Sequence, residues 1–327
     1  MPVSLSVCIE RWPIAGAFAI SRGVKTEAAV VLAELRDGDH VGRGECVPYP
    51  RYGETVDGVA SAIAALRPEI ARGLDRAALQ HAMPPGAARN ALDCALWDLA
   101  AKRSGRPAHE LAALPPLQPL TTAYTISLAA PEVMAAAAAK AAARTLLKIK
   151  LGGAGDPARI AAVRRAAPRA QLIVDANEGW TAANLQENLA ACAQAGVALL
   201  EQPLPSDADA ALAGIAHPIP ICADESAHAT ASLAALAGKY DAINIKLDKT
   251  GGLTEALAMA RVAQDMGFAL MVGCMVATSL AMAPAMLVAQ RARIVDLDGP
   301  LLLAGDRVHG LRYEDSRVHP PAPALWG

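Results

Sequence analysis

Short apolar stretches recur along residues 116–304, and each ends in a polar residue before an alanine- and leucine-rich segment. These stretches are TAYTIS, LLKIKLG, QLIVDAN, ALLEQPL, PICADES, DAINIKL, ALMVGCM and IVDLDG. Their polar ends recur roughly every 25 residues, which is about the length that a strand, a loop and a helix require. Eight such strands in one unbroken series predict a modified TIM barrel, (β/α)7β-like, rather than an open doubly wound sheet. No G-x-G-x-x-G motif follows the early strands, which counts against a dinucleotide-binding unit.

The first part of the chain has a different pattern. SLSVCIERWPI and KTEAAVVLAELRDG predict the two arms of a β-hairpin, with Asp37-Gly38 and Asp39 supplying turn residues. The Gly- and Pro-rich stretch GRGECVPYPRYGET is expected to form a loop, and the pattern is helical from about Thr55 to Leu114. We therefore predict an α+β domain over residues 1–115 and a barrel domain over residues 116–304. The C-terminal segment 305–327 is expected to pack with the α+β domain.

Composition narrows the functional class. The chain is 54% hydrophobic and 19% charged, with a formal net charge of −2, which disfavours disorder and nucleic-acid binding. Its six cysteines form no Cys-x-x-Cys pair, so reduced thiols are expected rather than a disulfide or zinc framework. Glu10 and Arg11 precede any long apolar run, so no signal peptide is predicted. The uncharged stretch 266–290 is interrupted by Gly273 and Pro284, so a buried strand and helix are expected there. We expect a soluble, cytoplasmic protein without membrane or nucleic-acid partners.

Charged residues stand where successive predicted strands end: Lys148, Lys150, Asp175, Glu201, Asp224, Lys246, Asp296 and Asp298. One such residue is commonly a solvated loop position, but a consecutive series at the catalytic end of a barrel indicates a site. Three carboxylates from adjacent strands form an oxygen-only site that suits Mg²⁺, with Mn²⁺ as a substitute. The alternative is a set of ion pairs with the lysines. Charge balance favours the metal, because three buried carboxylates repel one another.

The lysines indicate proton-transfer chemistry. Lys148 and Lys150 are two residues apart on a strand, so their side chains share a face. Lys150 and Lys246 lie on opposite flanks of the acidic residues in barrel order. Two amines on either side of a metal-held carboxylate can remove an α-proton from one face of a carbon and return one to the other. Metal charge and Lys148 would stabilise the resulting enediolate, and nearby positive charge would lower the lysine pKa.

These residues resemble the enolase superfamily in its muconate-lactonizing-type, Lys-x-Lys branch, and within it most closely the dipeptide epimerases. The resemblance covers almost the whole chain: ECVPYPRYGET, GAARNALDCALWDLA, KIKL, IVDANEGW, LEQPLP, ICADES, NIKLDKTGGLTEAL and VDLDGP. It implies a Mg²⁺-dependent isomerase that interconverts L-Ala-L-Glu and L-Ala-D-Glu, or related dipeptides, by proton transfer through an enediolate. It also implies a role in peptidoglycan recycling, and it leaves a homo-oligomer open.

The resemblance also implies individual roles. The metal ligands would be Asp175, Glu201 and Asp224, the two acid/base catalysts Lys150 and Lys246, and the supporting cation Lys148. Residues 1–115 would be a capping domain whose loops around 22–25 and 51–55 close the site. The implied substrate contacts are Asp296 and Asp298 to the α-ammonium of the dipeptide, together with Thr125, Lys25 and Arg51.

Lys25 departs from the arginine that some glutamate-specific members carry, and lysine keeps the charge but loses the bidentate fork. The competing functions are an N-acylamino-acid racemase, an o-succinylbenzoate synthase or a muconate cycloisomerase. Their substrates lack the free α-ammonium that Asp296 and Asp298 suit. A non-catalytic barrel scaffold is a further alternative, but none of the expected ligands or lysines is missing.

Overall fold

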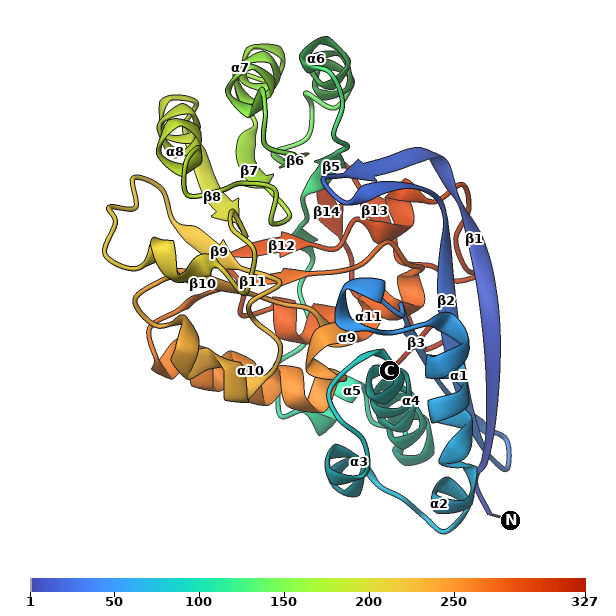
Figure 1. The fold of residues 1–327 in the computed structure, drawn as a ribbon. Coiled ribbons are helices and arrows are strands. Elements are labelled where there is room, and N and C mark those ends of the chain that lie inside the picture. Colours follow the sequence, from blue (N-terminus) through green and yellow to red (C-terminus); the bar gives the residue numbers. More distant parts are fainter. Residues whose placement is uncertain (1) are drawn as a thin grey trace.

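The N-terminal part is a three-stranded antiparallel sheet with the order β1-β2-β3. The computed structural model describes residues 2–327, and the sheet comprises β1 (Ser4–Ile20), β2 (Gly23–Asp37) and β3 (His40–Cys46) (Figure 1). The predicted hairpin arms are confirmed, although β1 runs on to Ile20 and the chain reverses at residues 21–22. The turn residues of 37–39 connect β2 to β3 instead.

The prediction that residues 42–55 form only a loop is wrong for residues 42–46, which belong to β3. The two glycines there serve close packing rather than a turn. A Cβ on Gly42 would lie 2.4 Å from the carbonyl oxygen of Ala95, and one on Gly44 would lie 2.1 Å from that of Ala91. Both carbonyls belong to the long helix α4 (Ala87–Ser104), so the glycines let this helix lie directly on the strand.

The helical stretch after the sheet is confirmed as five helices. They are α1 (Val56–Ala65), α2 (Arg67–Ala71), α3 (Arg76–Ala82), α4 and α5 (Ala108–Leu111). Thr55 and Asp75 cap α1 and α3 by accepting hydrogen bonds from backbone N–H groups in the first turn. Buried Val31, Leu35 and other apolar residues of the sheet pack against Ile63, Leu92 and their neighbours on the helices. The sheet and the helices thus bury one common apolar layer.

The second part is a parallel barrel of eight strands. They are β5 (Tyr124–Ile126), β6 (Leu146–Lys150), β7 (Gln171–Asp175), β8 (Val197–Glu201), β9 (Ile221–Ala223), β10 (Ala242–Ile245), β11 (Ala269–Gly273) and β12 (Ile294–Asp296). The strands lie side by side in chain order. The amide of Ala123 donates to the carbonyl of Val295 at 2.8 Å, which brings the first and last strands together. The predicted barrel is confirmed.

The layer around the barrel is not helical throughout. α6 (Pro131–Lys140), α7 (Asp156–Ala166) and α8 (Leu185–Gln194) follow β5, β6 and β7, and α9 (Leu247–Thr250), α10 (Leu253–Asp265) and α11 (Ser279–Ala289) follow β10 and β11. After β8 and β9 there are only the 3₁₀ helices η2 (Asp209–Leu212) and η3 (Thr230–Leu236). The segment after β8 contains four prolines, which disfavour a longer helix because they restrict the backbone and lack an N–H. The alternation expected from the sequence is therefore incomplete at these two units.

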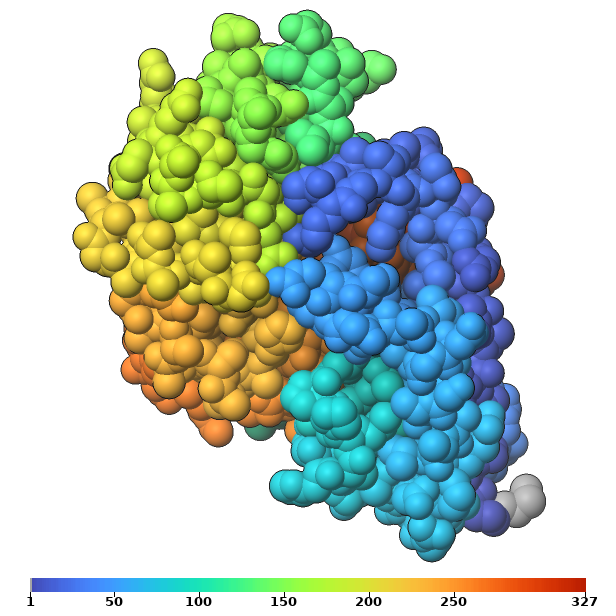
Figure 2. Space-filling view, in the orientation of Figure 1, coloured from blue at the N-terminus to red at the C-terminus, as the bar shows by residue number. Residues whose placement is uncertain are grey.

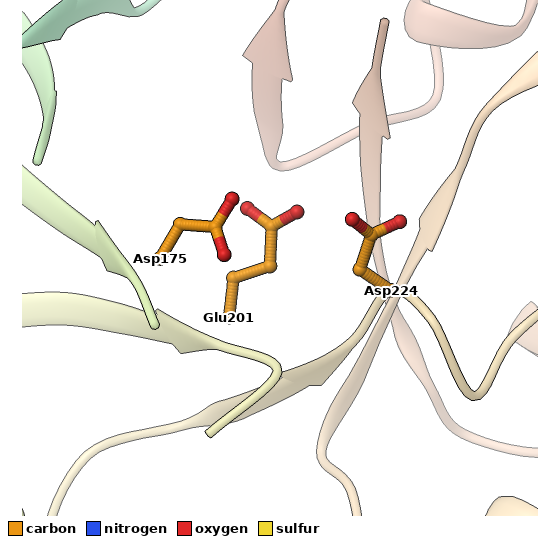
Figure 3. A group of neighbouring side chains, drawn as sticks. All are labelled: Asp175, Glu201 and Asp224. Carbon is orange, nitrogen blue, oxygen red and sulfur yellow. The ribbon is translucent and has the colours of Figure 1, made fainter. Parts of the chain in front are cut away.

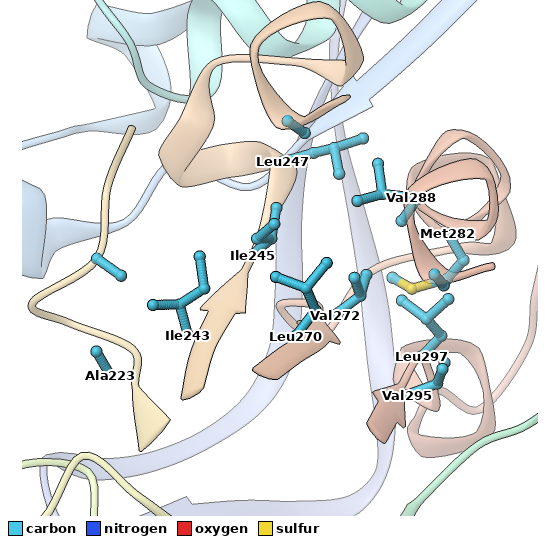
Figure 4. Close-up of a cluster of buried hydrophobic side chains, with 14 of the residues drawn as sticks. Ala223, Ile243, Ile245, Leu247, Leu270, Val272, Met282, Val288, Val295 and Leu297 are labelled. Atoms are coloured by element: carbon cyan, nitrogen blue, oxygen red, sulfur yellow. The ribbon is translucent and has the colours of Figure 1, made fainter. Parts of the chain in front are cut away.

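The barrel core has two apolar regions. Strand residues such as Ile243, Leu270 and Val272 face outward and pack against helical residues such as Met282 and Val288 (Figure 4). Inside the barrel, each strand or the residue just before it contributes one small or apolar side chain to a separate buried layer. The members of this layer are Ala123, Leu146, Ile173, Leu199, Cys222, Ala242, Met271 and Ile294. This inner layer closes the barrel below the site, as expected for a packed TIM-type interior.

The C-terminal residues contact both parts of the chain. After η4 (Gly299–Leu302), β13 (Tyr313–Glu314) and β14 (Arg317–Val318) form a small sheet with β4 (Leu120–Thr121) at the barrel. At the very end, the indole N–H of Trp326 donates to the carbonyl of Cys94 at 3.0 Å, and the amide of Gly327 donates to Asp98 at 2.7 Å. Within residues 2–327, no helix has the length and apolar character needed to cross a membrane.

Candidate functional site

Side chains alternate between the two faces of each strand, and this alternation places the charged residues predicted from the sequence on the inner face of the barrel. Every residue of the inner layer except Met271 is followed, two or four positions later, by a polar residue that points the same way. Thus Leu146 is followed by Lys148 and Lys150, Ile173 by Asp175, and Leu199 by Glu201. The charged residues therefore form the layer above the apolar one, at the carboxyl ends of the strands, where barrel enzymes carry their active sites.

Three carboxylates meet in this upper layer. Asp175 ends β7, Glu201 ends β8 and Asp224 follows β9, and all three are buried. One oxygen from each lies within 4.8 Å of the others, and Figure 3 shows the three groups pointing toward a shared space. The structure thus brings together the three residues predicted as metal ligands.

The electrostatics of this triad suit a divalent cation. Burial, reinforced by the Asp175 carboxylate, raises the pKa of Glu201 to about 7. Burial also opposes ionisation of Asp175, but Lys150 and Lys148 lower its pKa overall. Asp224 behaves in the same way, with Lys246 and Lys249 lowering its pKa. Asp175 and Asp224 are therefore held as carboxylates, and a nearby cation would favour ionisation of Glu201 as well. Three oxygen donors of this kind match the preference of Mg²⁺ or Mn²⁺ for hard, anionic ligands, so the residues present fit such an ion.

The three predicted lysines surround the triad. Lys150 Nζ lies 2.6 Å from Asp175 Oδ2, and Lys246 Nζ lies 2.6 Å from Asp224 Oδ2, so the two amines flank the carboxylates on opposite sides. Lys148 Nζ lies 2.7 Å from Glu201 Oε2 and 3.2 Å from Asp175 Oδ2. The predicted arrangement of one central and two flanking lysines is present.

The lysine pKa values do not follow the direction expected from the sequence. Burial lowers the pKa of Lys148 and Lys246, but the surrounding carboxylates, Asp296 and Asp224 respectively, raise both overall. The expected lowering therefore requires a cation that neutralises the carboxylates, because the side chains alone act in the opposite direction.

Asp296, Asp298 and Thr125 form a second group beside the triad. Asp296 Oδ2 accepts a hydrogen bond from Lys148 Nζ at 2.7 Å, and its other oxygen is buried and has no hydrogen-bond partner within residues 2–327. Asp298 Oδ2 accepts a hydrogen bond from the backbone N–H of Thr125 at 2.7 Å. Burial and the adjacent Asp296 raise the pKa of Asp298 to about 7. Thr125 thus acts here through its backbone, which fixes Asp298 across the junction of β5 and β12.

A cavity of about 630 Å³ lies above these residues, between the N-terminal sheet and the barrel mouth. Its walls include Lys150, Asp224, Lys246, Asp296 and Asp298 from the barrel. The opposite wall comes from the β1–β2 hairpin and from the loop at residues 47–56. Figure 2 shows the hairpin (dark blue) lying against the barrel. The sheet and its loops therefore cover the site.

Lys25 and Arg51 both line the cavity, but their surroundings differ. Arg51 makes a bidentate contact with Glu178 of the barrel, through Nε at 2.8 Å and Nη2 at 2.7 Å. Lys25 is exposed, its ammonium lies 5.0 Å from the centre of the Tyr49 ring, and within residues 2–327 it has no carboxylate partner. Lys25 is consequently the freer cation of the two.

Some residues of the site were not singled out from the sequence. Lys249 is buried and donates to Asp224 Oδ1 at 2.5 Å, and Asn244 donates to Glu201 Oε1 at 2.7 Å. Arg22, at the hairpin tip, contacts Glu225 Oε1 at 2.7 Å. The parity that places Lys246 inside the barrel also places Asn244 there, so strand alternation could have identified it. Nothing in the local sequence pairs Arg22 with Glu225, which lies far along the chain.

Comparison with known families gives a consistent result. Residues 3–112 match the N-terminal domain of the mandelate racemase/muconate lactonizing enzyme family, and residues 132–324 match the enolase C-terminal domain-like family. The L-Ala-D/L-Glu epimerase of Escherichia coli strain K12 is 46% identical over 318 residues, spanning 97% of this chain and 99% of that protein. The N-acetyl-D-glutamate racemase of a Pseudoalteromonas species is 45% identical over 300 residues, spanning 91% of this chain and 95% of that protein.

Solved structures agree on the fold. An enolase family member from Agrobacterium tumefaciens with homology to dipeptide epimerases, crystallised with sodium and L-Ala-L-Glu, is 58% identical with a TM-score of 0.99, over 100% of both chains. The dipeptide epimerase of Enterococcus faecalis V583, in complex with Mg and L-Leu-L-Tyr, is 27% identical with a TM-score of 0.91, over 99% of both chains.

Proposed function

The chain belongs to the mandelate racemase/muconate lactonizing enzyme family of the enolase superfamily, and from that premise we propose that it is a divalent-metal-dependent dipeptide epimerase. Its substrates are L-Ala-L-Glu and L-Ala-D-Glu. The observation that carries this proposal is the position of Lys150 and Lys246 on opposite sides of the carboxylate triad. The epimerase of Escherichia coli and the Agrobacterium tumefaciens protein that holds L-Ala-L-Glu support the choice of dipeptide.

The residues that would hold the metal are Asp175, Glu201 and Asp224. When bound there, Mg²⁺ or Mn²⁺ supplies positive charge that stabilises a substrate carboxylate as the adjacent carbon loses its proton. The protein adds Lys148, whose buried ammonium contacts two members of the triad and would add positive charge near the substrate carboxylate.

The two flanking lysines, Lys150 and Lys246, transfer the protons. The neutral amine of one takes the α-proton from the glutamate residue of the dipeptide, and the ammonium of the other donates a proton to the opposite face. The product has the same atoms with the configuration of that carbon inverted. The reverse reaction exchanges the roles of Lys150 and Lys246, because each must be a base for one stereoisomer and an acid for the other.

Substrate orientation comes from two further groups. The α-ammonium of the dipeptide pairs with Asp296 and Asp298, since Asp296 offers a buried oxygen that no protein donor within residues 2–327 occupies. The side-chain carboxylate of glutamate pairs with Lys25, the cation of the cavity wall that lacks a carboxylate partner in the same range. A dipeptide of this kind arises from peptidoglycan breakdown, so we propose recycling of that material as the cellular role.

Racemisation of an N-acylated glutamate is the second candidate, because the Pseudoalteromonas relative is named for such an activity. The two candidates differ at one group: the dipeptide has a free α-ammonium where the N-acyl substrate has a neutral acyl chain. Two buried aspartates favour the ammonium. Incubation with L-Ala-L-Glu and with N-acetyl-L-glutamate, followed by chiral chromatography of the glutamate, tests the choice. Inversion in the dipeptide alone supports our proposal, and inversion in N-acetylglutamate alone overturns it.

A further inference from the structure

A side chain outside the predicted set contacts the central carboxylate of the triad. Asn244 lies on β10, two residues before Lys246 and on the same inner face of the barrel, and it is completely buried. Its Nδ2 donates a hydrogen bond to Glu201 Oε1 at 2.7 Å. We propose that Asn244 is a positioning residue that fixes the orientation of Glu201 as a metal ligand.

The neighbouring strand is adapted to this amide. A Cβ on Gly273, at the end of β11, would lie 2.7 Å from Asn244 Nδ2 and 2.8 Å from Asn244 Oδ1. Gly273 does not have the positive φ angle that would otherwise require glycine. A Cβ at residue 273 would therefore enter the space that the Asn244 amide occupies and would displace it. This second observation, independent of the hydrogen bond, shows a site formed around the amide.

The chemistry of an amide suits this position. Glu201 lies between the other two ligands and has an oxygen near the ammonium of Lys148. A second lysine at residue 244 would also hold Glu201, but its full charge would repel a divalent cation. The neutral Asn244 amide directs Glu201 Oε1 through a hydrogen bond without adding that repulsion. Partners that orient a metal ligand in this way typically change metal affinity about 10- to 100-fold when removed.

The test measures metal binding rather than catalysis, and it rests on the proposed function only in that the triad binds a divalent cation. Purified full-length protein is titrated with Mn²⁺, and free Mn²⁺ is followed by electron paramagnetic resonance. The variants are Asn244→Ala, Gly273→Ala and the double variant. The control is Asn188→Ala on α8, a buried asparagine whose Nδ2 has no hydrogen-bond partner within residues 2–327. Circular dichroism checks the fold of each variant.

We expect Asn244→Ala and Gly273→Ala each to weaken Mn²⁺ binding about 10- to 100-fold. The double variant should bind no more weakly than Asn244→Ala, because removing the amide frees the space that a methyl group at residue 273 requires. Asn188→Ala should bind as the unaltered protein does. A merely structural role would lower the melting temperature of Asn244→Ala and leave its Mn²⁺ dissociation constant unchanged.

Unchanged Mn²⁺ affinity in a folded Asn244→Ala variant overturns the proposal, as do losses that add in the double variant. If Asn244→Ala does not fold, Gly273→Ala decides, because it retains the asparagine and displaces it. Absence of Mn²⁺ binding in the unaltered protein is a different result: it removes the metal centre itself, and the proposed function with it.

Discussion

Lys148 Nζ lies 2.7 Å from Asp296 Oδ2 and 2.7 Å from Glu201 Oε2, so one buried ammonium joins the carboxylate triad to Asp296 at the end of β12. The contact with Asp296 is a charge-assisted hydrogen bond, and the contact with Glu201 is an ion pair. The group expected to hold the metal and the group expected to hold the substrate ammonium therefore share a fixed cation. Under the proposed function, this link would set the spacing between a metal-held carboxylate and the N-terminal end of a dipeptide.

Metal removal is the simplest prediction. Treatment with EDTA should abolish epimerisation, and Mg²⁺ or Mn²⁺ should restore it. The same ions should raise the melting temperature, because a ligand at 100 times its dissociation constant stabilises the folded state by about 2.7 kcal/mol. Differential scanning fluorimetry measures this shift. The Asp175→Asn variant should show a much smaller shift, and an equal shift in that variant would place the ion elsewhere.

The two flanking lysines should be separable by isotope exchange. Lys150→Met and Lys246→Met should each lower the epimerisation rate by at least about 10²-fold, which is the usual contribution of a general acid or base. Each variant should still exchange the α-proton of one stereoisomer with solvent, and the two variants should differ in which one. Mass spectrometry of both dipeptide epimers in D₂O measures this. A variant that epimerises at a near-normal rate would rule out the scheme with two bases.

Asp298 should determine substrate affinity and not metal affinity. Replacing it by Asn removes a charge that pairs with the α-ammonium, so KM for L-Ala-L-Glu should rise about 10- to 100-fold, the equivalent of a charged hydrogen bond. Mn²⁺ affinity should stay unchanged. Steady-state kinetics and the Mn²⁺ titration together measure the two effects. Unaltered KM in the Asp298→Asn variant would remove the assignment to the ammonium.

Ionisation of Asp298 should make kcat/KM depend on pH. Burial and the neighbouring Asp296 raise its pKa to about 7. Below that pH the carboxyl is protonated and loses the negative charge that attracts the ammonium, so kcat/KM should fall as the pH decreases below about 7. The pH profile of the Asp298→Asn variant should lack this acid limb, and a limb that persists there would belong to another group.

Selectivity for glutamate should depend on Lys25 more than on Arg51. In Lys25→Met, the ratio of kcat/KM for L-Ala-L-Glu to that for L-Ala-L-Met should fall about fivefold, the value of an ion pair near 1 kcal/mol. Arg51→Met is the matched control, because Arg51 already pairs with Glu178. Competition assays with both dipeptides give the ratios. Equal ratios in Lys25→Met and the unaltered protein would show that the acidic side chain is recognised elsewhere.

Much of the barrel and its charged layer could be predicted from the sequence because both depend on local regularities. Strand ends recur along the chain, and the alternation that buries Ile173 and Leu199 also places Asp175 and Glu201 on the same inner face. The loop predicted over residues 42–55 is wrong at Gly42, because this glycine allows a helix carbonyl to approach the strand, and no local pattern encodes that contact. The pairing of Arg51 with Glu178 likewise depends on how the N-terminal sheet packs on the barrel. The spacing of residues along the sequence does not predict long-range contacts of this kind.

Under the proposed function, this site inverts the α-carbon of the glutamate residue in L-Ala-L-Glu. Proton NMR of L-Ala-L-Glu in D₂O with the protein and Mg²⁺ follows that α-proton directly. We predict that its signal disappears while the signals of L-Ala-D-Glu appear, and that EDTA prevents both changes. An α-proton signal that persists at full intensity, with Mg²⁺ present and the protein folded, would contradict the claim.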